Sequence, residues 1–142
     1  MKLEDQCVGL PLAKRLKELG VKQEGLFYWK YSNGSLERKS GIKISTELKF
    51  GTTPKFQNAG TWLACSAFTV SELGEMLPTA IFDEEFLSFD KVSSDPDGEN
   101  FTGWFCGYSK IAVYSKRESA PTIVDAAAKM LIHLIEKGLV KP

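Results

Sequence analysis

The last part of the chain carries an apolar repeat that fits only a helix packed against a neighbouring layer. One continuous stripe at helical spacing is formed by Val124, Ala127, Ala128, Leu131, Leu134 and Ile135. Pro121 lies near the start of this repeat and Gly138 just past its end, where helices favour these residues. Asp125 in the first turn and Lys137 in the last complement the helix dipole. We therefore predict a long C-terminal helix that covers a sheet.

A second amphipathic helix is predicted near the start of the chain, at about residues 10–19. Its apolar face holds Leu12, Leu16 and Leu19. Pro11 suits the first helical turn, and Gly20 suits the left-handed position after a helix end.

A short middle helix is predicted from Val70 to Leu77. The preceding Thr69 and the later Glu72 have the spacing of a capping box, in which the hydroxyl accepts from a backbone N–H and the carboxylate reaches back. Pro78 then ends the helix, because proline cannot continue it.

The segments between these helices have the patterns of strands. Aromatic residues fill the run 25–32, and Asn33-Gly34 after it is the strongest short hairpin signal, with a partner strand beginning near Leu36. Residues 42–50 alternate apolar and polar, as in a strand with one buried face. Further strands are predicted at residues 62–68, 85–91, 101–108 and 111–115.

This order of elements predicts one α+β domain over residues 1–142. We expect a mostly antiparallel sheet of about five to six strands, because most links between strands are too short for parallel crossovers. The N-terminal helix, the short middle helix and the long C-terminal helix flank that sheet. The run 101–108 is apolar on both faces, which indicates a central strand covered by a helix on one side.

The composition of the chain limits which partners and which cellular compartment we expect. The 142 residues hold 18 Lys and Arg against 18 Asp and Glu, so the chain lacks the basic excess of a nucleic-acid binder. No apolar run is long enough for a membrane span, and the polar N-terminus does not have a signal-peptide pattern. No two of the cysteines Cys7, Cys65 and Cys106 have the spacing of a zinc or redox motif. We expect a cytoplasmic protein with free, buried thiols, and neither nucleic acid nor membrane as a partner.

Catalytic motifs are missing from the sequence. His133 is the single histidine, so a three-histidine metal site is impossible, and no phosphate-binding glycine motif occurs. Cys106 lies in an apolar strand, where burial quenches a thiol. The acidic runs 83–85 and 95–99 are best explained as solvated charge and turn chemistry. We therefore expect no catalytic residue, no metal and no cofactor.

Aromatic side chains are the one unusual group of candidate binding residues in this chain. Alternation along the first strand places Phe27, Trp29 and Tyr31 on one face and Tyr28 on the other. One such face is core, whereas an exposed one could stack a base or a partner side chain. The candidate ligand- or partner-binding residues are Tyr28, Trp29, Tyr31, Trp62 and Trp104.

Three segments stand out together: LAKRLKELGVKQEGLFYW at 12–29, SAFTVSELGEMLP at 66–78 and DAAAKMLIHLIE at 125–136. In their order and spacing they resemble a family of small uncharacterised proteins of bacteriophages, prophages and gut Bacteroides-type bacteria. That family has no assigned activity, so the resemblance implies no catalytic residues. It implies an intracellular protein from a mobile element, with Leu26–Trp29 and the Glu72–Pro78 helix as the main family features.

Three functions follow as hypotheses. The leading one is a non-enzymatic accessory protein that binds a protein partner, with a homo-oligomer also open. The alternative is a small-molecule or nucleotide-binding protein that sequesters its ligand by stacking on Trp29, Trp62 or Trp104. The last is an enzyme that uses carboxylates alone, such as Glu72 or Glu75 with Asp83, and it requires a concave site.

Overall fold

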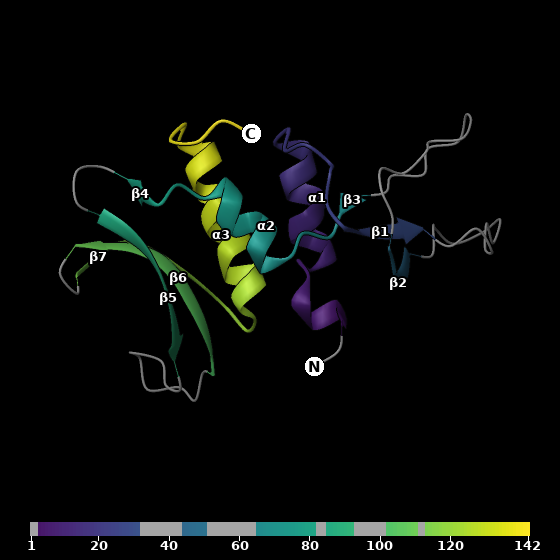
Figure 1. The fold of residues 1–142 in the computed structure, drawn as a ribbon, viewed down its shortest axis with the longest axis horizontal. Coiled ribbons are helices and arrows are strands. Elements are labelled where there is room, and N and C mark those ends of the chain that lie inside the picture. The colour runs from purple at the N-terminus through teal and green to yellow at the C-terminus, as the bar shows by residue number, and fades with distance from the viewer. Residues whose placement is uncertain (1–2, 32–43, 51–64, 82–84, 93–101, 111–112) are drawn as a thin grey trace.

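The computed structural model describes residues 3–31, 44–50, 65–81, 85–92, 102–110 and 113–142 (Figure 1). The helices in these ranges are the 3-10 turn η1 (Leu3–Gln6), α1 (Leu10–Glu18), α2 (Val70–Met76) and α3 (Ile123–Glu136). The strands are β1 (Phe27–Tyr31), β2 (Ile44–Phe50), β3 (Cys65–Ser66), β4 (Ala80–Ile81), β5 (Glu85–Val92), β6 (Gly103–Lys110) and β7 (Val113–Ala120). The described elements follow the predicted α+β order.

Helix α3 lies at the centre of the molecule. It packs against β6 and β7 on one side and against α1 and α2 on others, as Figure 1 shows. Its buried residues are Val124, Ala126, Ala127, Ala128, Met130, Leu131 and Leu134. A helix that is apolar on most of its circumference is stable only when it is covered on several sides. The three consecutive alanines keep α3 narrow, so its neighbours approach closely.

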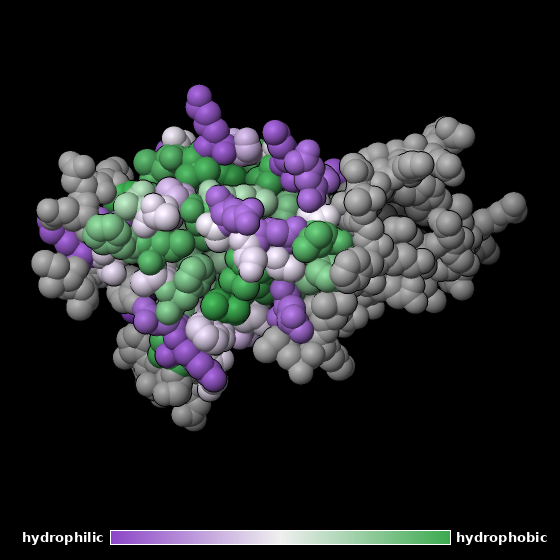
Figure 2. Space-filling view, viewed as in Figure 1, coloured by the Kyte–Doolittle hydropathy of each residue, from purple (hydrophilic) through white to green (hydrophobic). Residues whose placement is uncertain are grey.

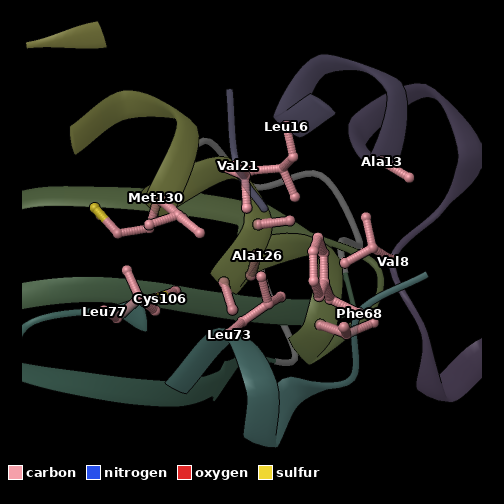
Figure 3. Packing of buried hydrophobic residues seen from close by; sticks show 14 of the residues in the cluster. Val8, Ala13, Leu16, Val21, Phe68, Leu73, Leu77, Cys106, Ala126 and Met130 are labelled. Atoms are coloured by element: carbon pink, nitrogen blue, oxygen red, sulfur yellow. The ribbon is translucent and has the colours of Figure 1, made fainter. Parts of the chain in front are cut away.

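The core around α3 draws side chains from all three α-helices. Figure 3 shows Leu16 of α1, Leu73 of α2 and Ala126 of α3 converging with Phe68, which lies just before α2. Each of these four side chains is essentially inaccessible to solvent. Packing of this kind contributes about 1.5–3 kcal/mol for each large apolar side chain.

Helices α1 and α3 run side by side in the same direction. The N–H of Gly9 donates to Asp125 Oδ1 at 2.8 Å, which joins the two helix starts. Towards the other ends, Arg15 donates to Glu136 Oε1 at 2.7 Å, although both side chains are substantially exposed. The Asp125 carboxylate thereby occupies the position before α1, where the helix dipole favours a negative charge.

The capping signals in the sequence are confirmed. Both bonds of the capping box are present, with Thr69 Oγ1 accepting from the N–H of Glu72 and Glu72 accepting from the N–H of Thr69. Gly20 and Gly138 have positive φ angles of 89° and 70° after α1 and α3. The bonds around them, such as the Val21 N–H to the Leu16 carbonyl, are those of a Schellman motif.

The described strands form two sheets, whereas the sequence predicted a single sheet of five to six strands. The orders are β2-β1-β3 and β4-β5-β6-β7, and every neighbouring pair is antiparallel, as predicted. Helix α2 follows β3 and precedes β4, so the chain crosses the helical layer between the two sheets (Figure 1). The predicted turn at Asn33-Gly34 and the strand start near Leu36 lie outside the described residues.

The ends of several strands differ from the predicted ends, and two short elements were not predicted. Strand β7 extends to Ala120, five residues beyond the predicted end, through a stretch of charged and small residues without clear alternation. Its register with β6 is instead continued by pairing of residues such as Cys106 with Glu118. The two-residue β4 and the η1 turn were not predicted. Of the predicted strand 62–68, the structure describes Cys65–Ser66 as β3.

A side-chain network fixes the chain between α1 and β1. Ser66 is fully buried; its Oγ accepts from the Gly25 N–H at 3.2 Å, and its own N–H donates to Gln23 Oε1 at 2.7 Å. One residue further, the Leu26 N–H donates to Glu72 Oε1 at 2.8 Å. These bonds satisfy backbone groups in a segment that has no strand or helix of its own.

We predict that Leu134→Ala lowers the free energy of unfolding by about 2–5 kcal/mol, because it leaves a cavity at the centre of the core. Leu139→Ala is the matched control, since Leu139 is 44% exposed, and it should change stability by less than about 0.5 kcal/mol. Urea unfolding of both variants measures the difference. If both variants lost the same free energy of unfolding, α3 would not be the centre of the packing.

We predict opposite effects for two glycine substitutions. A Cβ at Gly25 would lie 3.0 Å from Ser66 Cβ, so Gly25→Ala should destabilise the fold by about 1–3 kcal/mol. A Cβ at Gly74, within α2, meets nothing within 4 Å, so Gly74→Ala should stabilise by about 0.4–1 kcal/mol. Thermal unfolding distinguishes the two, and a destabilised Gly74→Ala variant would contradict this reading of α2.

Candidate binding surface

The three thiols are buried and poorly suited to nucleophilic chemistry. Burial, and then the nearby Glu118, raises the pKa of the Cys106 thiol to about 12. Burial, followed by Glu72, raises the pKa of Cys7 to about 11, and burial also raises the pKa of Cys65. A thiol becomes a nucleophile only as its thiolate, so the prediction of core thiols is confirmed.

His133 is half-buried on α3 and faces charged groups rather than a thiol. Burial lowers its pKa, and Lys116 on β7 adds to that effect, whereas Glu118 opposes it. Lys116 is itself paired with Glu118 at 3.2 Å. Among the described residues, no hydrogen bond joins His133 to a thiol or a carboxylate, so no nucleophile–base pair is formed there.

Of the carboxylates singled out in the sequence, Glu72 has a structural role. Glu72 accepts from the N–H groups of Leu26 and Thr69 and from the Thr69 hydroxyl. Glu75 is exposed on α2. Asp83 and the acidic run 95–99 lie outside the described residues. Glu72 is therefore an anchor for the fold, and its pairing with Asp83 stays untested.

The predicted aromatic candidates do not form one site in the described structure. Trp29 is 7% exposed, and its indole N–H donates to the Val8 carbonyl at 2.7 Å, as expected for core packing. Trp104 lies in the other sheet, half-buried against the core. Tyr28 and Tyr31 are residues of β1, whose side chains at these positions are not described, and Trp62 lies outside the described residues.

One face of the four-stranded sheet is turned away from α3, and we call it the outer face. Leu87 and Phe89 of β5 pack against the core, so the alternating residues Phe86, Ser88 and Asp90 point the other way. The strand register extends this face across β6 and β7. Its described members are Phe86, Ser88, Asp90, Phe105, Gly107, Ser109, Arg117 and Ser119.

The outer face combines aromatic rings with a guanidinium group. Phe86 is 62% exposed, the largest exposure among the large apolar residues described. The Arg117 guanidinium carbon lies 4.7 Å from the centroid of the Phe105 ring, which is a cation–π contact. In the view of Figure 2, apolar and charged side chains are interleaved over the described part of the surface.

Ser88, at the middle of this face, has a hydroxyl that the described part of the chain does not satisfy. Its Oγ is buried and has no hydrogen-bond partner among the described residues. Ser88 stands opposite Gly107, which stands opposite Arg117. A buried hydroxyl without a partner destabilises a protein by about 1–3 kcal/mol, so this position is not explained by packing.

Sequence reasoning missed Phe86, which is exposed, and Phe105, which is half-buried, as aromatic residues of the outer face. The signal was present, because the run 101–108 was recognised as apolar on both faces. What it could not reveal was which face α3 covers. The register places Trp104, Cys106 and Tyr108 inside, and Tyr108 donates to the Pro78 carbonyl at 2.6 Å. Phe105 therefore lies outside.

Comparisons with protein-family models, with curated proteins and with solved structures find no match. Within the described ranges, no helix has the length and apolar character needed to cross a membrane. Nor do three or more His, Cys, Asp or Glu side chains gather there in a way that could hold a metal ion.

We predict a pH dependence of stability that arises from the thiols. The folded pKa of Cys106 is about 12 against an ordinary value of 9.0, so the folded state favours the protonated thiol. The contribution of this thiol to the free energy of unfolding is fully present below pH 9.0 and is lost as the pH rises towards 12. Urea unfolding above pH 9.0 should show a shallower decline for Cys106→Ala than for the wild type. If the free energy of unfolding fell equally steeply with pH in both proteins, the raised pKa of Cys106 would be contradicted.

Proposed function

We propose that this protein is a non-enzymatic binding domain whose outer face takes a protein partner. The proposal is based on Phe86 and Ser88, which lie two residues apart on the same face of β5. One exposes a large aromatic ring, and the other buries an unsatisfied hydroxyl. The buried hydroxyl opposes stability, and such a cost is tolerated where function requires it.

The chemistry of the outer face supports a protein as the partner. Aromatic and arginine side chains are enriched at protein interfaces and at their energetic centres. Phe86, Phe105 and Arg117 supply these residue types on a sheet, which holds them in fixed relative positions. The three thiols and the Glu72 carboxylate, by contrast, are buried or hydrogen-bonded within the fold. The resemblance to phage and prophage proteins is consistent with an intracellular accessory role.

A nucleotide or similar planar molecule is the second candidate, favoured by the contact between Arg117 and Phe105. An arginine beside an aromatic ring can stack on a base and neutralise a phosphate. Thermal shift against a nucleotide panel tests it, because a ligand at ~100 times its dissociation constant adds about 2.7 kcal/mol of stability. A shift abolished by Phe105→Ser would establish this candidate in place of the first.

The protein-binding proposal predicts a specific effect of Phe86→Ser. A partner captured from host cells by the wild-type chain and then purified should bind this variant at least about tenfold more weakly. Leu139→Ser is the matched control, because it also removes an exposed apolar side chain but lies after α3. Quantitative binding assays on the three chains give the result. Equal affinity for all three, or turnover of a substrate by the wild type, would refute the proposal.

A further inference from the structure

Strand β5 is covered by its neighbour on one side for only part of its length. β4 has two residues, and these pair with Phe86 and Glu85. One further bond, from the Leu87 N–H to the Thr79 carbonyl at 3.0 Å, extends the contact. The next residue that could bond on this side is Leu77, but its N–H donates to the Leu73 carbonyl at 2.9 Å, so the ladder does not continue. β5 itself runs on to Val92, past the short β4 in Figure 1.

The backbone groups left open on this edge can be assigned. The Leu87 N–H points towards β4, and backbone direction alternates along a strand. The N–H and C=O groups of Phe89 and Lys91 therefore point to the same edge, while Ser88 and Asp90 pair with β6. No strand in the described part of the chain pairs with this edge beyond Leu87. An edge of this kind is a template for another strand.

The opposite edge of the same sheet is protected. Lys129 Nζ donates to the Ser119 carbonyl of β7 at 2.7 Å, which occupies an outward backbone acceptor. The pairing of β7 with β6 also shifts register beside Tyr108, as at a β-bulge. A bulge and a side-chain bond to an outward carbonyl both hinder the pairing of an edge with another strand. The β5 edge carries neither a bulge in its pairing with β6 nor a bond of this kind among the described residues.

A second copy of the chain is a poor occupant of the β5 edge. A two-fold antiparallel pairing that uses the whole open stretch from Ser88 to Val92 is centred on Asp90. It would place Asp90 opposite Asp90 of the other copy. Directly opposed like charges destabilise a strand pair, so the edge favours a different chain.

We propose that the β5 edge from Ser88 to Val92 binds an extended segment of a partner protein as an added antiparallel strand. This inference rests on the proposed function, and it names how the partner engages. The segment continues the line of β4, with main-chain bonds to Phe89 and Lys91. Opposite-charge and apolar pairing then select an acidic residue against Lys91, a basic one against Asp90 and an apolar one against Phe89. The order along the segment is acidic, basic, apolar.

The test is selection from a library of random peptides of about twelve residues, displayed on ribosomes, against the full chain. We expect selected peptides to carry the acidic-basic-apolar order. Lys91→Pro should weaken their binding at least about tenfold, because it removes an N–H that makes no bond within the sheet. Lys91→Ala is the matched control, since it keeps the N–H, and its binding should change only a few-fold.

Hydrogen exchange on the wild-type chain gives a second readout that does not depend on folding of the proline variant. The amides of Phe89 and Lys91 should exchange quickly in the free chain and slowly with a selected peptide bound. Unchanged exchange at both amides would overturn the edge inference. A cellular partner lost with Phe86→Ser but retained with Lys91→Pro would overturn it while leaving the proposed function intact. A partner unaffected by either variant would refute both.

Discussion

The burial of α3 is the constraint on which the remaining structure depends. Its apolar surface extends around most of the helix, so a single neighbouring layer could not cover it. The β6–β7 pair, α1 and α2 each cover a part. The bonds from Gly9 to Asp125 and from Arg15 to Glu136 then set the direction of α1 along it. The polar contacts act on an arrangement that apolar burial makes favourable.

Burial also separates the parts of the molecule that hold the fold from the part available for binding. The three thiols are buried in the core. The Trp29 indole and the Glu72 carboxylate form hydrogen bonds to backbone groups within the fold. The outer face of the four-stranded sheet has no helix of the described structure against it, and its register fixes the positions of Phe86, Phe105 and Arg117. The same sheet keeps the β5 edge extended. A rigid support with exposed groups on one side is the usual design of a binding domain.

Local signals in the sequence predicted much of this fold, and long-range ones were less informative. The capping box at Thr69 and the glycine after each long helix act within a few residues, so their outcome could be foreseen. The separation into two sheets depends on where α2 inserts, which no local pattern encodes. The length of β7 depends on register with β6, because its own residues lack alternation. Trp29 lies on a covered face of its sheet and Phe105 on the outer face of the other sheet, and aromatic composition cannot reveal which faces are covered.

We conclude that the core around α3 joins both sheets and α1 in one cooperative unit. Native-state hydrogen exchange under increasing denaturant tests it most directly, because it measures the free energy of opening for each element. We expect the slowest amides of α1, α3, β1 and β6 to open with one common free energy, equal to that of global unfolding. Opening of the β4–β7 sheet at a distinctly lower free energy, with α1 and α3 still protected, would contradict it.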